Sequence, residues 1–350
     1  MKTEHILIIR FSAMGDVAMT VPVVQALARQ YPHLRITFLS RPFARPFFEG
    51  LAPNVGFMAA DIKNEYSGIR GLNALYKRIA AKNITAVADL HDVLRSSYLR
   101  FRFNLARYRV EHIDKHRTQR QRLVATTHKV MKPLPTAFQN YADVFAKLGY
   151  PVKLDFTSIF SPQGGNIRIL PPEIGTKKAF QEWIGVAPFA AHKQKVYPPE
   201  MLEKMITMLT KEHPSCRVFI FGKGPLEDPI INGIVSRNPQ CINASAVLNG
   251  ISQELVLMSH LDVMVSMDSA NMHFASLVNT PVVSIWGATH PYAGFMGWGQ
   301  NEHNAVQIDL ACRPCSIFGN KPCLRGDLAC MRNISPEMVY ERVKQVLNKK

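Results

Sequence analysis

The sequence predicts an α/β protein made of two Rossmann-like domains, each built on a mostly parallel sheet. The chain has 350 residues, more than one hydrophobic core usually serves. Short apolar runs alternate with helical patterns in its first half, which is typical of βαβ units. The same alternation restarts after an irregular segment rich in proline and glycine. Two such domains would face each other across a central cleft, where ligands bind.

The first half begins with an apolar run at residues 6–9, which we expect to form a buried strand. A helical pattern follows over residues 17–30, with Pro22 either in its first turns or at a kink. Two further strands are expected at residues 35–39 and 86–90.

An irregular segment covers residues 150–178 and carries paired Pro and Gly signals without helical periodicity. We interpret it as the connection between the domains. The predicted organisation is therefore an N-terminal domain at 1–160, a linker at 161–180, a C-terminal domain at 181–332 and a final helix at 333–350 that packs back on the first domain.

The second half repeats the architecture of the first. Ser335-Pro336 is a typical helix start, with serine as the cap and proline at the first helical position, for a last helix that reaches residue 347. Another helix is expected to begin near Ser269. The expected strands are 183–187, 217–221, 263–266 and 281–286, and a further helix is expected at 199–211.

The first motif follows strand one and contains Ser12, Met14, Gly15 and Asp16. Ligands bind at this carboxyl edge in doubly wound sheets. Gly15 lets the backbone approach a ligand closely, and Asp16 presents a carboxylate suited to a general base at a helix start. The alternative is that Asp16 only caps the helix. The single glycine excludes the dinucleotide fingerprint.

The second motif follows the strand at 183–187 and contains Ala190, Ala191, Lys193 and Lys195. Lysines in a loop before a helix suit a diphosphate leaving group, whose charge a cation and backbone N–H groups stabilise. Lys195 is the stronger candidate. The alternative is a pair of solvated lysines.

The third motif places Asp268, Ser269, Ala270 and His273 at a strand-to-helix turn, where the helix N-terminus can bind a phosphate. Ordinary capping by Asp268 or Ser269 is the alternative, as is a buried structural role for His273.

These motifs resemble glycosyltransferase family 9, the lipopolysaccharide heptosyltransferases, in the same order along nearly the whole chain. The resemblance rests on S-x-M-G-D, K-x-Y-P, D-S-x-x-M-H and T-P-V-V-x-x-W-G-x-T-x-P. It implies a GT-B fold, a donor site in the C-terminal domain, an acceptor site in the N-terminal domain, and inversion at the anomeric carbon with no metal or other cofactor required for catalysis.

By resemblance, Asp16 is the general base and Lys195 binds the donor phosphates. Asp268, Ser269 and His273 match the donor-binding turn, and Glu227 stands where the family places a carboxylate for the ribose. The sequence departs from the family pattern at Ala270, where glycine is common, at Ala190 and Ala191, where hydroxyl residues are common, and at residues 287–291, which replace G-P-T-D-P. Ala190 and Ala191 would then contact the diphosphate through backbone N–H groups.

The expected function is transfer of a sugar, heptose above all, from an ADP-heptose-like donor to a lipopolysaccharide core or related anionic glycolipid. A non-catalytic sugar-nucleotide-binding protein is the alternative, and the presence of Asp16 favours an enzyme. A nucleic-acid-binding protein is disfavoured because no recognised motif accompanies the positive charge.

The formal charge of +16 is concentrated in the first half, where eleven Lys or Arg stand against two acids between Arg95 and Lys132. We expect Arg117, Arg120 and Arg122 to contact the anionic acceptor at the membrane surface. A solvated helix face is the alternative. The first apolar run is too short for a signal peptide, so the expected location is the cytoplasm, at the cytoplasmic face of the inner membrane.

Four of the six cysteines are clustered: Cys312, Cys315, Cys323 and Cys330. Their number and the C-x-x-C spacing are those of a structural zinc site. Reduced thiols and a disulfide are the alternatives, and a cytosolic location disfavours the disulfide.

Overall fold

The computed structural model describes residues 4–349 and divides into two compact units. The first unit runs to Lys115 and resumes over Thr136–Phe156, while the second holds His116–Pro135 and the chain from Thr157 onward. These boundaries differ from the expected domains, because residues 116–135 and 161–180 both pack within the second unit.

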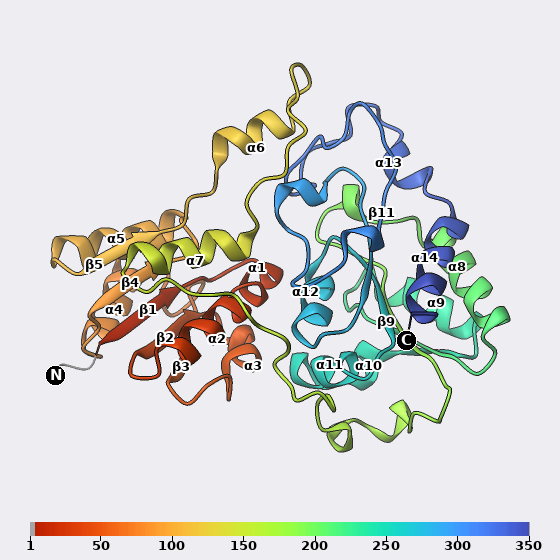
Figure 1. Ribbon diagram of the computed structural model, residues 1–350, viewed down its shortest axis with the longest axis horizontal. Coiled ribbons are helices and arrows are strands. Elements are labelled where there is room, and N and C mark those ends of the chain that lie inside the picture. The colour runs from red at the N-terminus through yellow and green to blue at the C-terminus, as the bar shows by residue number, and fades with distance from the viewer. Residues whose placement is uncertain (1–3, 350) are drawn as a thin grey trace. The chain divides into compact units, whose positions relative to one another are not determined.

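The first unit is built on a five-stranded parallel sheet in the order β3-β2-β1-β4-β5 (Figure 1). All five residues of β1 are buried, as expected for a central strand covered on both faces. Ile6 pairs with Ile36 on one side and Ala86 on the other. The strands are β1 (His5–Ile9), β2 (Arg35–Ser40), β3 (Val55–Ala59), β4 (Ala86–Asp89) and β5 (Arg109–His112).

The helix expected at residues 17–30 is two helices, α1 (Met14–Ala18) and α2 (Val21–Gln30). Pro22 lies in the first turn of α2, where its missing N–H costs no helical hydrogen bond. The other helices of this unit are α3 (Arg45–Phe48), α4 (Gly68–Ala80), α5 (Leu94–Leu105) and α7 (Ala137–Lys147).

The second unit repeats this topology with a sixth strand, in the order β8-β7-β6-β9-β10-β11. Every pairing in it is parallel. The strands are β6 (Trp183–Ala187), β7 (Arg217–Ile220), β8 (Cys241–Asn243), β9 (Val263–Met267), β10 (Val282–Ile285) and β11 (Ala305–Val306).

The final helix, α14 (Pro336–Leu347), belongs to the second unit. It contacts α8 (Pro199–Glu212) and the sheet, and it buries Val339, Tyr340 and Val343 in the core of this unit. Ser335 caps it as predicted, because its hydroxyl accepts the N–H of Met338 at 3.3 Å. The remaining helices are α6 (Arg117–Leu123), α9 (Asp228–Arg237), α10 (Ala244–Val247), α11 (Ile251–Met258), α12 (Ala270–Leu277) and α13 (Ala329–Arg332).

The segment expected as a linker is held to the second unit by an ion pair and a backbone hydrogen bond. Lys177 forms an ion pair with Asp262 at 2.7 Å, and the Gly165 N–H donates to the Ser259 hydroxyl at 2.9 Å. Between residues 4 and 349, no helix combines the length and the apolar character needed to cross a membrane.

Candidate active site

Both units place predicted site residues where the strand order reverses: Asp16 and Lys195, predicted as catalytic, and Asp268, predicted to bind the donor. In the first unit this point lies between β1 and β4, and Asp16 follows β1. In the second it lies between β6 and β9, with Lys195 after β6 and Asp268 after β9. Ligands of open α/β sheets bind at such switch points, outside the carboxyl ends of the strands.

In the first unit, Asp16 is paired with Arg10, the residue that directly follows β1. The Arg10 Nη2 lies 2.9 Å from the Asp16 Oδ2, and the Asp16 side chain is 25% exposed against 8% for Arg10. The same oxygen accepts the Ala13 N–H at 3.1 Å, so Asp16 does stabilise the start of α1. The Asp16 side chain therefore makes a capping contact while a quarter of it stays exposed.

Arg10 links the elements around this carboxylate. Its guanidinium donates to the carbonyl of Leu90 after β4 and lies 5.5 Å from the ring centroid of Tyr141 on α7. Burial opposes its charge, but Asp16 and Tyr141 outweigh burial and raise the pKa of Arg10. The Arg10 guanidinium is buried, charged and held by Leu90 and Tyr141, so it fixes the position of the Asp16 carboxylate.

His91 completes this half of the site from the end of β4. Its Nδ1 accepts the Phe11 N–H at 3.4 Å, which leaves the proton of the neutral ring on Nε2, 3.3 Å from the Ser12 hydroxyl. Burial, Arg10 and Lys115 lower the pKa of His91 to about 3, so the ring is neutral near pH 7. The backbone N–H of His91 donates to the buried carboxylate of Asp89 at 2.9 Å.

The other residues predicted for the acceptor fall into two groups. Ser12 is half-buried and Met14 is exposed beside Asp16, while Gly15 is buried in α1. Arg117, Arg120 and Arg122 lie on α6, which belongs to the second unit and not, as expected, to the unit that holds Asp16. The Arg120 guanidinium lies 5.0 Å from the ring of Phe295, so this arginine packs on the second unit.

In the second unit, the structure brings Lys195 and Asp268 together. The Lys195 Nζ lies 3.1 Å from the Asp268 Oδ2, and the lysine side chain is 14% exposed against 7% for the aspartate. Lys195 ends a short 3-10 turn, while Lys193 in the same turn is exposed. Of the two predicted lysines, Lys195 is therefore the one held at the switch point.

The Lys195 side chain packs closely against a glycine, Gly319. Gly319 has a φ of +75°, and a Cβ atom placed on it would lie 2.5 Å from both the Cγ and the Cδ of Lys195. Its N–H donates to the buried Ser316 hydroxyl at 2.9 Å, and the Ser316 N–H donates to the carbonyl of Ala288. Only glycine leaves room for this lysine stem.

The turn at Asp268 leads directly into α12. Ser269 stands at the N-cap position but makes no capping hydrogen bond with its side chain, and its hydroxyl lies 3.2 Å from that of Ser266. Ala270 begins the helix, and His273 is buried in it. Asp268 forms the ion pair with Lys195, and Ser269 makes no side-chain hydrogen bond to the N-terminus of α12. The alternative that Ser269 is an ordinary helix cap is therefore wrong.

Glu227 lies at the start of α9, after the neighbouring strand β7. Burial raises its pKa, the Lys223 backbone opposes this change, and Asp228 adds to it. Ala190 and Ala191 follow β6 and are half-buried and exposed, respectively, so their backbone groups are near the surface.

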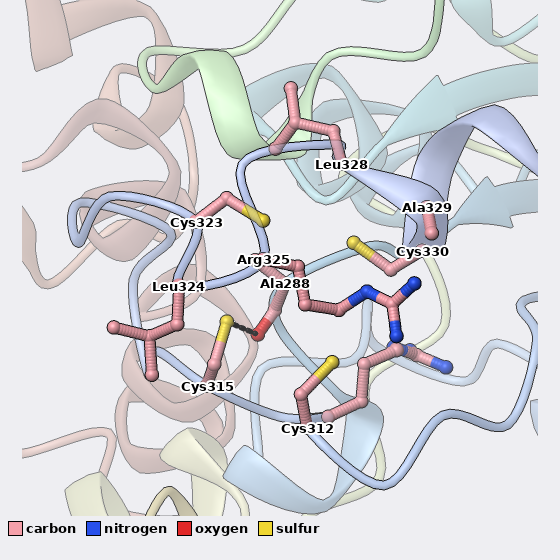
Figure 2. Close-up of a pocket in the computed structure, with 10 residues that line it drawn as sticks. Ala288, Cys312, Cys315, Cys323, Leu324, Arg325, Leu328, Ala329 and Cys330 are labelled. Carbon is pink, nitrogen blue, oxygen red and sulfur yellow. Dashed lines mark hydrogen bonds between the residues drawn. The ribbon is translucent and has the colours of Figure 1, made fainter.

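The four predicted metal ligands line one pocket, but their side chains do not form a coordination site as they stand. Cys312, Cys315, Cys323 and Cys330 all border it, and all four are free thiols (Figure 2). In the part of the chain that the structure describes, no group of three or more His, Cys, Asp or Glu side chains has the arrangement of a metal site.

Arg10, His91 and Gly319 were not predicted. Arg10 and His91 each follow a predicted strand, and a polar residue at the carboxyl end of a buried strand is the signal that could have singled them out. Their contact depends on β4 lying beside β1, which the sequence pattern does not specify. Gly319 is distant from Lys195 in the sequence.

Two Rossmann-like units, each built on a parallel sheet with one switch point, define a class of α/β proteins whose ligands typically bind at these points. The profile of Glycosyltransferase family 9 (heptosyltransferase) matches residues 72–321, and the chain belongs to this family. Its architecture is accordingly the GT-B fold that the sequence predicted.

Individual relatives are distant. The chain is 28% identical over 133 residues to lipooligosaccharide heptosyltransferase 2 of Campylobacter jejuni, a match that spans 37% of this chain and 40% of that relative. It is 24% identical to lipopolysaccharide heptosyltransferase 3 of Escherichia coli over 84% of this chain and 85% of that one. The solved structure of the E. coli heptosyltransferase WaaC with ADP shares 16% identity and superposes with a TM-score of 0.67, covering 98% and 99% of the two chains.

Proposed function

We propose that this protein is an inverting glycosyltransferase that moves a heptose from an ADP-heptose-like donor to a hydroxyl of a lipopolysaccharide core or related anionic glycolipid. The observation that carries the proposal is the pair of opposite charge arrangements at the two switch points. One unit presents a carboxylate held by a buried arginine, and the other presents a lysine held by a buried aspartate.

The lysine side of this arrangement suits the donor. A diphosphate gains negative charge as the sugar leaves, and a fixed cation near it stabilises that charge without a metal ion. The N-terminus of α12 and the backbone near Ala190 and Ala191 add N–H groups of the kind that bind phosphates. A family relative solved with ADP supports an adenine nucleotide as the donor's leaving group.

The carboxylate side suits the acceptor. Asp16 removes the proton from the acceptor hydroxyl while that oxygen attacks the anomeric carbon on the face opposite the diphosphate, so the product has inverted configuration. The pair with Arg10 holds the carboxylate in one orientation. General-base assistance of this kind contributes roughly 10²- to 10⁴-fold to the rate.

The exposed arginines of α6 suit an anionic acceptor. Arg117 and Arg122 are exposed, whereas Arg120 is engaged with Phe295. We place the reaction at the cytoplasmic face of the inner membrane, where cationic side chains gain about 1 kcal/mol each from anionic lipid. Replacing Arg117 and Arg122 with Ser should weaken acceptor use and flatten its salt dependence, with the donor constant unchanged.

A donor panel tests the proposal. Thermal stabilisation and nucleotide release are measured with ADP-, GDP- and UDP-linked sugars, including ADP-heptose, each with and without a lipopolysaccharide core acceptor. We expect ADP-heptose to stabilise the protein most and to release ADP in an acceptor-dependent manner. Binding without acceptor-dependent release would support a non-catalytic sugar-nucleotide-binding protein instead.

A further inference from the structure

The helix α5 carries apolar residues on two opposite faces. On one face, Leu99 and Phe103 are buried in the core of the first unit. On the other, three large apolar side chains are exposed to solvent by 90%, 61% and 71%: Leu94, Phe101 and Leu105. A helix face turned to solvent is normally polar, so this apolar face indicates a binding surface.

The spacing of these residues joins them into one stripe. Phe101 lies seven residues after Leu94, and Leu105 lies four residues after Phe101, intervals that return to the same side of an α-helix. Tyr98 fills the remaining step and is half-buried, with its hydroxyl donating to the Asn73 Oδ1 on α4 at 3.0 Å. We call Leu94, Tyr98, Phe101 and Leu105 the apolar stripe.

The neighbouring helix α4 adds positive charge beside the stripe. The two helices pack against each other (Figure 1), and Arg102 of α5 also donates to Asn73. Arg70 and Lys77, seven residues apart on α4, are both exposed, and Ile69 in its first turn is 67% exposed. We call the apolar stripe together with Ile69, Arg70 and Lys77 the α4–α5 surface.

Negative charge is scarce in this part of the chain. Residues 66–110 contain nine Lys or Arg and two acids, Asp89 and Asp92. Each acid lies 3.2 Å from the Arg100 guanidinium, and their side chains are 0% and 13% exposed. The described residues of this segment therefore present apolar and cationic side chains to solvent with little opposing charge.

We propose that the α4–α5 surface binds an anionic lipid bilayer. Helices of this kind lie in the membrane interface, with Phe and Leu side chains buried roughly 5–10 Å into the boundary between headgroups and acyl chains and with Lys and Arg on headgroup phosphates. Charge favours this occupant over a second copy of the chain, because two chains of formal charge +16 repel each other.

The surface begins near the proposed base. Leu94 opens α5 three residues after His91. The His91 Nε2 lies 3.3 Å from the hydroxyl of Ser12, which precedes Asp16 in the first motif. Bilayer contact through this helix would bring the carboxyl edge of the first sheet close to the headgroups. A lipid-linked acceptor would then reach Asp16 without leaving the membrane, a consequence that rests on the proposed function, whereas lipid binding itself does not.

The test measures binding of the full-length protein to vesicles by sedimentation, with neither donor nor acceptor present. The vesicles contain phosphatidylcholine alone or phosphatidylcholine with phosphatidylglycerol. We expect wild type to bind the anionic vesicles and Phe101→Gln/Leu105→Gln to bind them at least about 10-fold more weakly. Phe180→Gln/Leu324→Gln is the matched control and should bind as wild type does, since it removes a Phe and a Leu that are 99% and 72% exposed in the second unit.

The contribution of the charges is tested on the same vesicles. Arg70→Gln/Lys77→Gln should weaken binding to the anionic vesicles by about 5-fold for each cation removed and leave binding to phosphatidylcholine unchanged. High salt should erase this difference, because ions screen exposed charges, and should leave the loss in Phe101→Gln/Leu105→Gln in place.

A second measurement locates the contact directly and does not depend on the glutamine variants folding. The fluorescence of Phe101→Trp should be quenched by brominated lipid in anionic vesicles beyond the quenching of wild type, and that of Phe180→Trp should not.

Several results would overturn the proposal: no binding of wild type to anionic vesicles, wild-type affinity in Phe101→Gln/Leu105→Gln, an equal loss in the matched control, or no added quenching in Phe101→Trp. A wild-type dimer that Phe101→Gln/Leu105→Gln dissociates would also overturn it, because this face would then be an interface between copies of the chain.

Discussion

The two units share a strand order and differ in the sign of the charge that they present. At the first switch point the arginine is the more buried partner and Asp16 is the more exposed, at 8% against 25%. At the second, Asp268 is the more buried partner and Lys195 the more exposed, at 7% against 14%. The same topology thus presents an anion in one unit and a cation in the other.

In our proposal, this difference in charge lets one fold bind both the donor and the acceptor of a transfer reaction. A carboxylate is needed where a hydroxyl loses its proton, and a cation is needed where a diphosphate leaves. In each unit the buried partner contributes no chemistry of its own in our proposal and serves to position the exposed one. The following predictions test that division.

The largest effect is expected for Asp16. Asp16→Asn keeps the shape of the side chain but removes the base, so we expect turnover to fall by about 10²- to 10⁴-fold with little change in the donor's KM. Asp155→Asn is the control, since Asp155 forms an exposed ion pair with Arg29 in the same unit. Turnover close to wild type in Asp16→Asn would remove Asp16 from the chemistry.

The next largest effect is expected for Lys195. Lys195→Ala should lower kcat/KM for the donor by about 10²-fold, because the leaving diphosphate loses its fixed cation. Lys193→Ala is the matched control, since Lys193 lies in the same turn and is exposed. Equal losses in the two lysine variants would show that only the general positive charge of the loop matters.

A smaller effect is expected from moving the lysine without removing it. Gly319→Ala should lower kcat/KM by roughly 10-fold, since the new methyl group must displace the Lys195 stem. Gly326→Ala imposes similar backbone strain at a φ of +78° but meets no atom within 4 Å. The two variants should lose similar stability and differ in activity, and equal activities would contradict the positioning role of Gly319.

The smallest effect concerns stability and compares histidines in the two units. The pKa of His91 is lowered to about 3 and that of His290 to about 4, both chiefly by burial. The unfolded chain therefore binds more protons below pH 6.5, and the free energy of unfolding falls as the pH falls from that value toward the folded pKa. Each histidine should therefore lower the free energy of unfolding by about 1.4 kcal/mol at pH 5.5 relative to pH 7.5.

Denaturant unfolding at these two pH values checks this prediction. His91→Gln and His290→Gln should each reduce the loss between pH 7.5 and 5.5 by that amount. If a variant loses as much free energy of unfolding between pH 7.5 and 5.5 as wild type does, other groups of that unit, and not the histidine, account for the loss.

Much of the fold could be predicted because its central strands are continuous apolar runs. The strands β1 and β6 occur where the sequence places them, and the caps of α14 follow from Ser335 and Pro336. The sequence also places Asp16, Lys195 and Asp268 after strands, and the structure has them after β1, β6 and β9. Their electrostatic partners were partly missed, because Arg10 acquires its role only from the elements that meet around it.

The assignment of α6 shows a second limit. Positive charge indicated an anionic partner but carried no information about which unit the helix packs on. That is decided by contacts such as Arg120 with Phe295 and Lys129 with the carbonyl of Arg313, whose partners lie far along the chain. Charge density alone does not specify long-range packing.

Binding of ADP to the two central variants tests the division of charge most directly, since it needs neither sugar nor acceptor. We predict by calorimetry that Asp16→Asn binds ADP with the dissociation constant of wild type and that Lys195→Ala binds it at least about 10-fold more weakly. Equal affinity in Lys195→Ala and wild type, or an equal loss in Asp16→Asn, would contradict the assignment of the cation to the donor and the carboxylate to the acceptor.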